Sequence, residues 1–324
     1  SVILAATLLI SCSKSNNDLL SNEDNQQTTI VPVKGENTSS ALAVKKFLFD
    51  ASQGETAGNA DWVIDEDNST PQRIPTPLQS TITSTTADTY WTGGISSWGI
   101  SLAKLGQTVE TLPSNGLITY GVTTNAQDLK NYDVFVVDEP NIRFTTAEKQ
   151  AILSFVQNGG GLFMIGDHTL SDRNNDGWDS PAIWNDLMTN NGLISNPFGF
   201  SFDLVDITQL SSNVRTNSST NPLINGSQGL VTKLDFHNGA TLTLQPTVNP
   251  NVQGLFWMNN YAQSTTKVMA AASAYGTGRV YCVTDSSPMD DGSGAPNNTL
   301  YVSWSLYSHK AQFMNASLWL AKLQ

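Results

Sequence analysis

The sequence is poor in cysteine and in charged side chains. It contains only two cysteines among 324 residues, Cys12 and Cys282, and 14% of its residues are charged. Because Cys12 lies in a segment that resembles a processing site, Cys282 is left without a partner inside the mature chain, and disulfides do not hold the fold together. Hydrophobic residues make up 39% of the chain, enough for a full core in one large domain or two small ones.

Basic residues are also scarce. The 16 Lys and Arg are outnumbered by 28 Asp and Glu, which gives a formal net charge of -12. This balance argues against nucleic acid and against anionic membrane surfaces as partners, because both repel an acidic protein. A neutral small molecule, a glycan or a cation fits the composition better.

Several sequence motifs of common enzyme classes are missing. The chain has three histidines and no HExxH spacing, no GxSxG elbow and no GxGxxG after a predicted strand. These absences disfavour a zinc protease, a serine hydrolase and a dinucleotide-binding protein.

The first twelve residues, SVILAATLLISC, form an apolar run that is too short to span a bilayer. Their end resembles the lipobox of bacterial lipoproteins, whose cysteine, here Cys12, is lipid-modified and becomes the mature N-terminus; a buried segment that happens to end in Cys is the alternative. Residues 13–43 are rich in Ser, Asn, Gln and Thr, which predicts a disordered tether. We therefore expect a signal-peptide remnant at 1–12 and a protein of the cell envelope. It would contact a bacterial membrane, the outer one by expectation, only through its lipid and would face the periplasm or the exterior.

The remainder, 44–324, alternates apolar strand-like runs with helical segments, which predicts a single α/β domain with a mostly parallel, flavodoxin-like sheet and helices on both faces. A loop-rich or β-rich insertion is expected at about 190–250. The predicted strands are 46–51, 109–112, 133–137, 162–165, 268–274 and 279–284, and the predicted helices are 98–105, 147–157 and 311–323.

Two segments carry a family resemblance. The run DVFVVDEPN, the helix FTTAEKQAILSFVQNGGG and the strand GLFMIGDH at 133–168 resemble the class I glutamine amidotransferase-like superfamily, especially its ThuA-like branch. The hairpin AAASAYGTGRVYCVTDSS at 270–287 is similar to the closing strands of that superfamily. Its amidotransferases carry a nucleophilic cysteine where this chain has Gly166-Asp167-His168, so the resemblance implies the fold but not glutamine hydrolysis.

Acidic residues follow the predicted strands at the ends where ligands bind in open parallel sheets. They are Asp50, Asp138, Glu139, Asp167 and Asp285. Any one of them has a simpler interpretation as a solvated acid that caps the next helix. Together they predict a site, because converging carboxylates repel unless a cation or shared protons relieve them. We expect Asp167, His168, Glu139 and Asp285 to line one pocket, with His168 available for acid–base work or metal ligation.

The segment Asp172 to Asp179, DRNNDGWD, has oxygen-bearing side chains at alternating positions followed by glycine, as in the first half of an EF-hand-type loop. The expected calcium ligands are Asp172, Asn174, Asp176, the backbone carbonyl of Trp178, and Asp179. Ile183 occupies the position where such a loop places a bidentate Glu, so an Asx-rich turn without metal is the alternative.

Two functions are compatible with these features. The first is a hydrolase-like enzyme that acts on an extracellular glycan or other neutral polymer, with the strand-end acids as catalysts. The second is a non-catalytic, calcium-stabilised lipoprotein that binds such a ligand. Aromatic residues could stack on sugars or be buried in the core; the candidates are Tyr90, Trp91, Trp98 and Trp178.

Overall fold

The computed structural model describes residues 42–57, 60–67, 70–294 and 300–324. The predicted lipobox with Cys12, and the predicted tether up to residue 41, lie outside these ranges. Within them, no helix combines the length and the apolar character needed to cross a bilayer.

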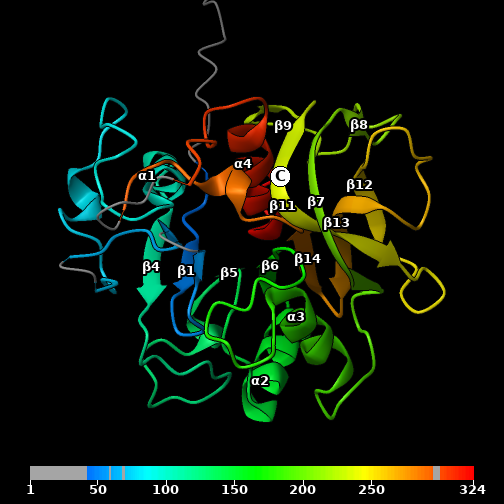
Figure 1. Cartoon of the computed structure of the whole chain (residues 1–324). Helices are drawn as coiled ribbons and strands as arrows, with labels where there is room; N and C mark the ends of the chain where they lie inside the picture. The colour runs from blue at the N-terminus through cyan, green and yellow to red at the C-terminus, as the bar shows by residue number, and fades with distance from the viewer. Residues whose placement is uncertain (1–41, 58–59, 68–69, 295–299) are drawn as a thin grey trace, which may run out of the picture. The chain divides into compact units, whose positions relative to one another are not determined.

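A ten-stranded sheet forms the centre of the domain (Figure 1). Its parallel part has the order β4-β1-β5-β6-β14. The bounds are β1 Lys46–Asp50, β4 Thr108–Leu112, β5 Val134–Asp138, β6 Gly161–Ile165 and β14 Gly278–Val283. Numbered along the chain, this order is 2-1-3-4-5, which is the flavodoxin-like arrangement. The predicted fold class is confirmed, and each of these strands overlaps a predicted one.

The sheet continues beyond β14 in antiparallel strands. They are β13 Val268–Tyr275, β11 Leu234–Leu244 and β7 Phe200–Ser211; β12 Gln253–Trp257 pairs with β13 off this path, and β8 Asn213–Val214 pairs with β12. Small two-stranded pairs lie outside it: β2 Thr56–Ala57 with β3 Ala60–Asp61, and β9 Asn225–Gly226 with β10 Gly229–Leu230. The region at about 190–250 thus contributes two of the longest strands to the central sheet.

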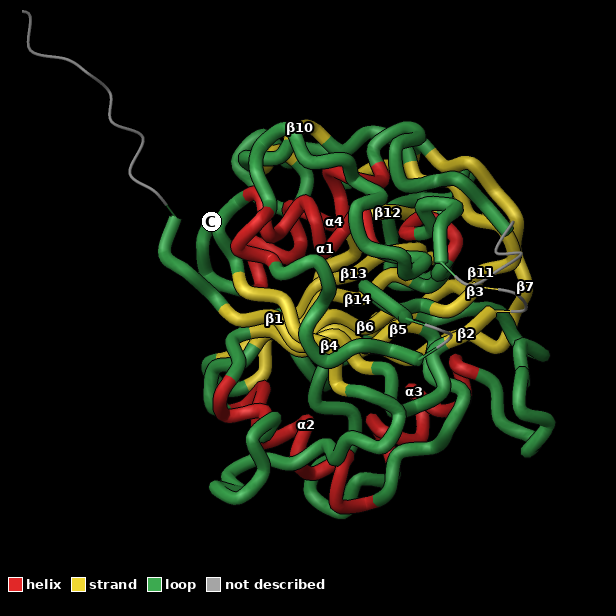
Figure 2. Tube along the Cα trace, turned by 90° about the vertical axis from the view of Figure 1, so that its left-hand side faces the viewer, coloured by secondary structure: helices red, strands yellow, loops and turns green. Residues whose placement is uncertain are grey.

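Helices cover both faces of the sheet (Figure 2). On one face lie α1 Ser96–Lys104 and α4 His309–Leu320, and on the other α2 Thr146–Gln157 and α3 Ser180–Thr189. Three short 3-10 helices are η1 Gln79–Thr81, η2 Leu129–Asn131 and η3 Ser287–Met289. The predicted capping box is present at the start of α2, where Thr145 and Glu148 bond each other's backbone N–H groups. Because helices cover both faces of the sheet, β5 and β6 are buried along their whole length.

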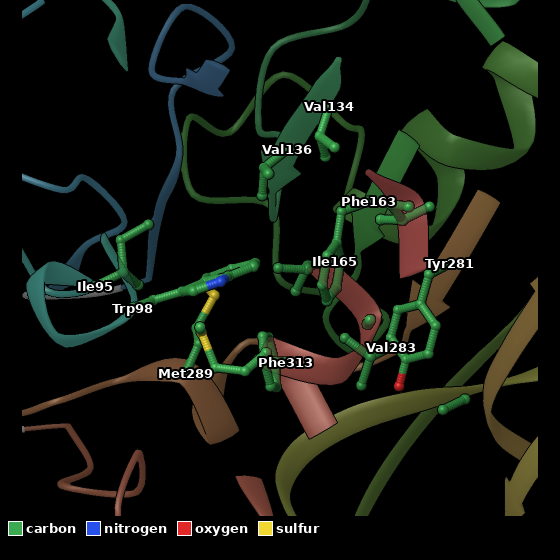
Figure 3. Close-up of a cluster of buried hydrophobic side chains, with 14 of the residues drawn as sticks. Ile95, Trp98, Val134, Val136, Phe163, Ile165, Tyr281, Val283, Met289 and Phe313 are labelled. Atoms are coloured by element: carbon green, nitrogen blue, oxygen red, sulfur yellow. The ribbon is translucent and has the colours of Figure 1, made fainter. Parts of the chain in front are cut away.

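The aromatic residues of α1 and its approach belong to the core. Trp98 is fully buried and points into a cluster with Ile165, Met289 and Phe313 (Figure 3), and Trp91 is buried as well. The Trp98 indole N–H donates to Ser317 Oγ at 3.0 Å. The core interpretation therefore holds for both tryptophans, and neither is available to stack on a sugar.

Candidate active site at the carboxyl ends of the parallel strands

A cavity of about 200 Å³ opens where the carboxyl ends of β6 and β14 meet a bend in β11. It is lined by Trp62, Asp167, His168, Arg173, His237, Asn238, Ser286, Ser287, Leu300 and Tyr301. The bend arises from irregular pairing of β11 with β7 between Phe236 and Thr241, and such bulges re-aim side chains near binding sites. The lining mixes acids, a guanidinium, imidazoles, hydroxyls and aromatic rings.

Glu139 lies directly behind this cavity in an unusual backbone conformation. It follows β5 with a φ of 44°, in the left-handed region that costs a residue with a Cβ about 1 kcal/mol or more. Its carboxylate is fully buried and accepts hydrogen bonds from the Trp62 indole N–H at 2.8 Å and from Ser286 Oγ at 2.7 Å. The surroundings thus hold the side chain in one place despite the strained backbone.

Glu139 and Asp167 form a pair of carboxyl groups that are hydrogen-bonded to each other. A bond between two carboxyls requires a proton on one of them. Arg173 spans the pair, with Nη2 at 2.9 Å from Asp167 Oδ2 and Nε at 3.3 Å from Glu139 Oε1. The cluster therefore consists of two acids, one shared proton and one fixed positive charge.

Burial sets the protonation of the pair. Desolvation, reinforced by the charge of Asp167, raises the pKa of Glu139 well above its usual range. Desolvation also raises the pKa of Asp167 to about 7, while the hydrogen bond with Glu139 and the charge of Arg173 lower it. Glu139 is thus the member that keeps its proton, and Asp167 changes charge near neutral pH.

Asp285 is a third buried carboxyl beside this pair. It follows β14, is fully buried, and accepts backbone N–H groups from His237 at 2.6 Å and Ser287 at 2.9 Å. Desolvation raises the pKa of Asp285 to about 7 against the effect of these hydrogen bonds. Gly239 lets β11 approach, because a Cβ there would lie 2.7 Å from the Asp285 Cβ.

His168 occupies the cavity wall next to Asp167. Its Nδ1 lies 2.6 Å from the carbonyl oxygen of Thr169, and since a carbonyl only accepts, Nδ1 carries a hydrogen. In the neutral imidazole this leaves Nε2 as the basic nitrogen, 3.7 Å from Asp167 Oδ2. Asp206 lies on the other side of the ring, 3.6 Å from Nδ1.

The structure brings together the four residues expected to form the site. Asp167 and His168 line the cavity, whereas Glu139 and Asp285 are buried behind it. Two other strand-end acids do not line it: Asp50 is hydrogen-bonded to Glu55, and Asp138 is buried without a hydrogen-bond partner in the described part of the chain. Sequence reasoning missed Arg173, His237 and Tyr301 as members of the site.

Arg173 belongs to the segment expected to bind calcium, and the other side chains of that segment fold it into a tight turn. Asp172 accepts the backbone N–H groups of Asp176 and Gly177, and Asp176 accepts that of Trp178. Asn174 Nδ2 ties the turn to the carbonyl of Asn141. The arrangement directs the Arg173 side chain onto the acid pair.

The remaining two residues of the predicted calcium set have structural contacts. Asp179 is the N-cap of α3, where it accepts the N–H of Ala182 at 3.0 Å. The Trp178 ring is covered by the guanidinium of Arg143, 3.7 Å from the ring centroid, so that this face is not free for a sugar. Across the residues that the structure describes, no three His, Cys, Asp or Glu side chains converge as a metal site. Calcium binding stays a prediction.

Chelation tests it. If Ca²⁺ binds the segment only in the folded state, adding EGTA should lower the melting temperature, and adding Ca²⁺ should restore it. Asp176→Ala should abolish the difference, while Asp133→Ala, a surface acid elsewhere, should leave it intact. A melting curve that is the same with EGTA and with Ca²⁺ would establish the metal-free Asx turn.

No protein-family model and no curated protein matches the sequence. Among solved structures, the chain is similar to one described as "mmIFT52 N-terminal domain", at 12% identity over 85% of this chain and 97% of the other, with a TM-score of 0.53. ThuA-like proteins of Parabacteroides merdae and Bacteroides uniformis also match, each at 13% identity. They cover 86% and 88% of this chain and 90% and 94% of theirs, with TM-scores of 0.44 and 0.38. ThuA-like proteins are thus among the structural neighbours, and the likeness is one of fold alone.

Proposed function

We propose that the protein is a hydrolase-like enzyme that acts on a glycan or other neutral polymer in the cavity beside Asp167. The observation that carries this proposal is the Glu139–Asp167 pair under Arg173, in which one carboxyl keeps its proton and the other ionises near pH 7. A general acid or base works best when its pKa lies near the operating pH. Asp167 meets that condition and faces the cavity.

In this proposal Asp167 takes a proton from the attacking water. The proton then passes to the leaving group through Nε2 of His168, which lies 3.7 Å from Asp167 Oδ2. Arg173 holds the pair in place and stabilises the negative charge that Asp167 carries before it accepts a proton. Ser286 and the indole of Trp62 keep the Glu139 carboxyl oriented.

The size and lining of the cavity support a small neutral unit as the group that binds. At about 200 Å³ the cavity is smaller than the roughly 300–1,000 Å³ of typical ligand pockets. It would hold one terminal unit of a polymer rather than the middle of a chain. The Tyr301 and His237 rings stack with their centroids 4.2 Å apart and offer a flat, partly apolar wall of the kind on which sugar rings pack.

The experiment is a substrate screen on the full chain. We expect release of a single sugar or other terminal unit from at least one member of a panel of 4-nitrophenyl glycosides, 4-nitrophenyl esters and reduced oligosaccharides. Saturable binding of an oligosaccharide at this cavity without any turnover would overturn the proposal that the protein is an enzyme. It would favour the alternative, a ligand-binding lipoprotein. Absence of both turnover and binding at millimolar concentration would overturn the proposal that the cavity takes a glycan.

We also propose that the protein is a lipoprotein of the cell envelope, anchored through Cys12. The LISC motif followed by a polar stretch supports this. Metabolic labelling with an alkyne-bearing fatty acid should tag the full-length protein when it is expressed in bacteria, and Cys12→Ser should remove the label. Cys282→Ser is the control, because that buried cysteine should not affect it. Equal labelling of the Cys12→Ser variant and the wild type would rule the anchor out.

A further inference from the structure

A second cavity lies on the antiparallel side of the sheet, away from the residues of the candidate active site. Its volume is about 470 Å³, within the range of small-molecule sites. The walls come from the residues that follow β8, from β12, and from the segments 244–246 and 263–265. The lining residues are Arg215, Thr216, Asn217, Leu244, Pro246, Val252, Gln253, Gly254, Trp257, Gln263, Ser264 and Thr265.

The charge of this cavity is opposite to that of the protein. The chain carries a net charge of -12, yet none of the residues lining this cavity is acidic, and Arg215 alone among them is charged. The cavity beside Asp167, in contrast, is lined by one carboxyl group, that of Asp167, and the Glu139 carboxyl lies directly behind it. The two cavities are therefore suited to different chemical groups.

Arg215 is held firmly but is not neutralised. Its backbone N–H donates to the carbonyl of Leu255 at 2.8 Å, and Nη1 donates to the carbonyl of Gly254 at 3.0 Å. Arg73, Arg143 and Arg173 each have a carboxylate within 4.0 Å. Arg215 has no such partner among the residues that the structure places. A guanidinium has five N–H donors in a planar fork, so most of them are left for a ligand.

The rest of the wall is rigid and carries neutral hydrogen-bonding groups. Gln263 ties the loop between β12 and β13 to β8, since its Nε2 donates to Asn213 Oδ1 at 3.1 Å and to the carbonyl of Val214 at 2.7 Å. The indole N–H of Trp257 donates to the carbonyl of Ser264 at 2.8 Å, which fixes that ring in the wall. Gln253 lines the cavity from β12. A ligand with several hydroxyl groups would find amides and hydroxyls at the positions around the guanidinium.

We infer that this cavity binds a saccharide that carries a carboxylate or sulfate group, with the guanidinium of Arg215 taking the oxyanion. Two oxygens of a carboxylate or of a sulfate group can accept two parallel hydrogen bonds from the guanidinium fork, and such charge-assisted bonds are about twice as strong as neutral ones. The amide and hydroxyl groups of the wall would bind the sugar hydroxyls. The inference does not depend on the activity proposed for the cavity beside Asp167.

The test uses the full chain and three probes of similar size: digalacturonate, lactose 6'-sulfate and uncharged lactose. Isothermal titration calorimetry should show the charged disaccharides binding at least about tenfold more tightly than lactose, which corresponds to one charge-assisted contact. The NMR signal of the Trp257 indole N–H should shift on binding and so report the location. Weaker binding at high salt is expected, because the contact is ionic.

Arg215→Gln removes the charge and keeps a hydrogen-bonding amide, and it should reduce the affinity for both charged probes to that for lactose. Lys310→Gln is the matched control: it loses the same charge on α4, where Lys310 pairs with Asp88, and should bind like the wild type. The thermal melting curve of each variant checks its folding. Equal affinity for charged and uncharged probes, unchanged binding by Arg215→Gln, or no binding at millimolar concentration would overturn the inference. Binding of inorganic sulfate as tight as that of the sulfated sugar would overturn the saccharide part.

Discussion

Replacing Asp167 by Asn should lower kcat/KM roughly a hundredfold or more on any substrate that the protein turns over, because Asn fills the same space but cannot exchange a proton. The acid limb of the pH profile should disappear as well. In the wild type, activity should rise as the pH passes the Asp167 pKa of about 7, since the proposed base must be ionised. The variant should retain a flat, low rate across the same range.

The matched control is Asp133→Asn, the same chemical change at a surface acid that pairs with Lys45 at the amino end of β5. It should keep wild-type activity and pH dependence. His168→Asn should lower kcat without shifting the acid limb of the pH profile, because that limb is assigned to Asp167. An Asp167→Asn variant that folds normally and keeps more than about a tenth of the wild-type kcat/KM would remove Asp167 from the catalytic role.

The helices that cover both faces of the sheet explain which elements could be predicted from the sequence. The inner parallel strands are buried on both faces, so they occur as uninterrupted apolar runs such as VFVV at 134–137 and LFMI at 162–165. The helix α2 begins with a capping box and ends before three consecutive glycines, which fixes both ends. These local signals were enough for the fold class and for the positions of the strand-end acids.

The helix α3 carried a signal that the prediction overlooked. Asp179 caps it, Pro181 lies in its first turn, and Ile183, Trp184 and Leu187 are buried against the sheet. The same acidic segment predicts either calcium ligands or an Asx-rich turn, and neither prediction includes a helix cap at Asp179. Local composition does not distinguish these two uses of side-chain oxygens, because each supplies acceptors to nearby positive or polar groups.

The place of Arg173 in the candidate site and the burial of the tryptophans depend on contacts between distant parts of the chain. Arg173 lies among Asp and Asn residues, but its partner Glu139 is 34 residues away and its position depends on how the turn docks on the strand ends. Trp98 lies next to serines and glycines on a helix, but it packs on Phe163 and Phe313. Such pairings are set by the topology, and no spacing within the sequence reveals them.

The buried carboxyls have a consequence for stability that can be measured. Desolvation raises the pKa of Asp50 to about 6 and those of Asp167 and Asp285 to about 7, whereas an unfolded Asp has a pKa near 3.9. Between about pH 4 and pH 7 the folded state therefore binds more protons than the unfolded state. The stability that these groups provide is fully present below about pH 4 and is lost as the pH rises through 6 and 7.

Other acids act in the opposite direction at lower pH. Hydrogen bonds with lysines or backbone N–H groups outweigh desolvation and lower the pKa values of Asp88, Asp128 and Asp186. Their contribution to stability is present above about pH 4 and is lost as the pH falls through their lowered pKa values. The two groups of acids together place the stability maximum well on the acidic side of neutrality, at about pH 4.

Urea unfolding at pH 5 and at pH 8 should therefore give a clearly smaller free energy of unfolding at pH 8. Asp50→Asn should reduce that difference by about 1.4 kcal/mol, because its folded-state pKa of about 6 lies about one unit above pH 5 and only that unit falls between the two pH values. The substitution keeps the acceptor for Ser52 and places an N–H₂ group toward Glu55, so the fold should survive it. Asp133→Asn should leave the difference unchanged. Equal stability of the wild type at the two pH values would mean that these carboxyls are ionised in the folded protein, and that counter-charges or water reach them.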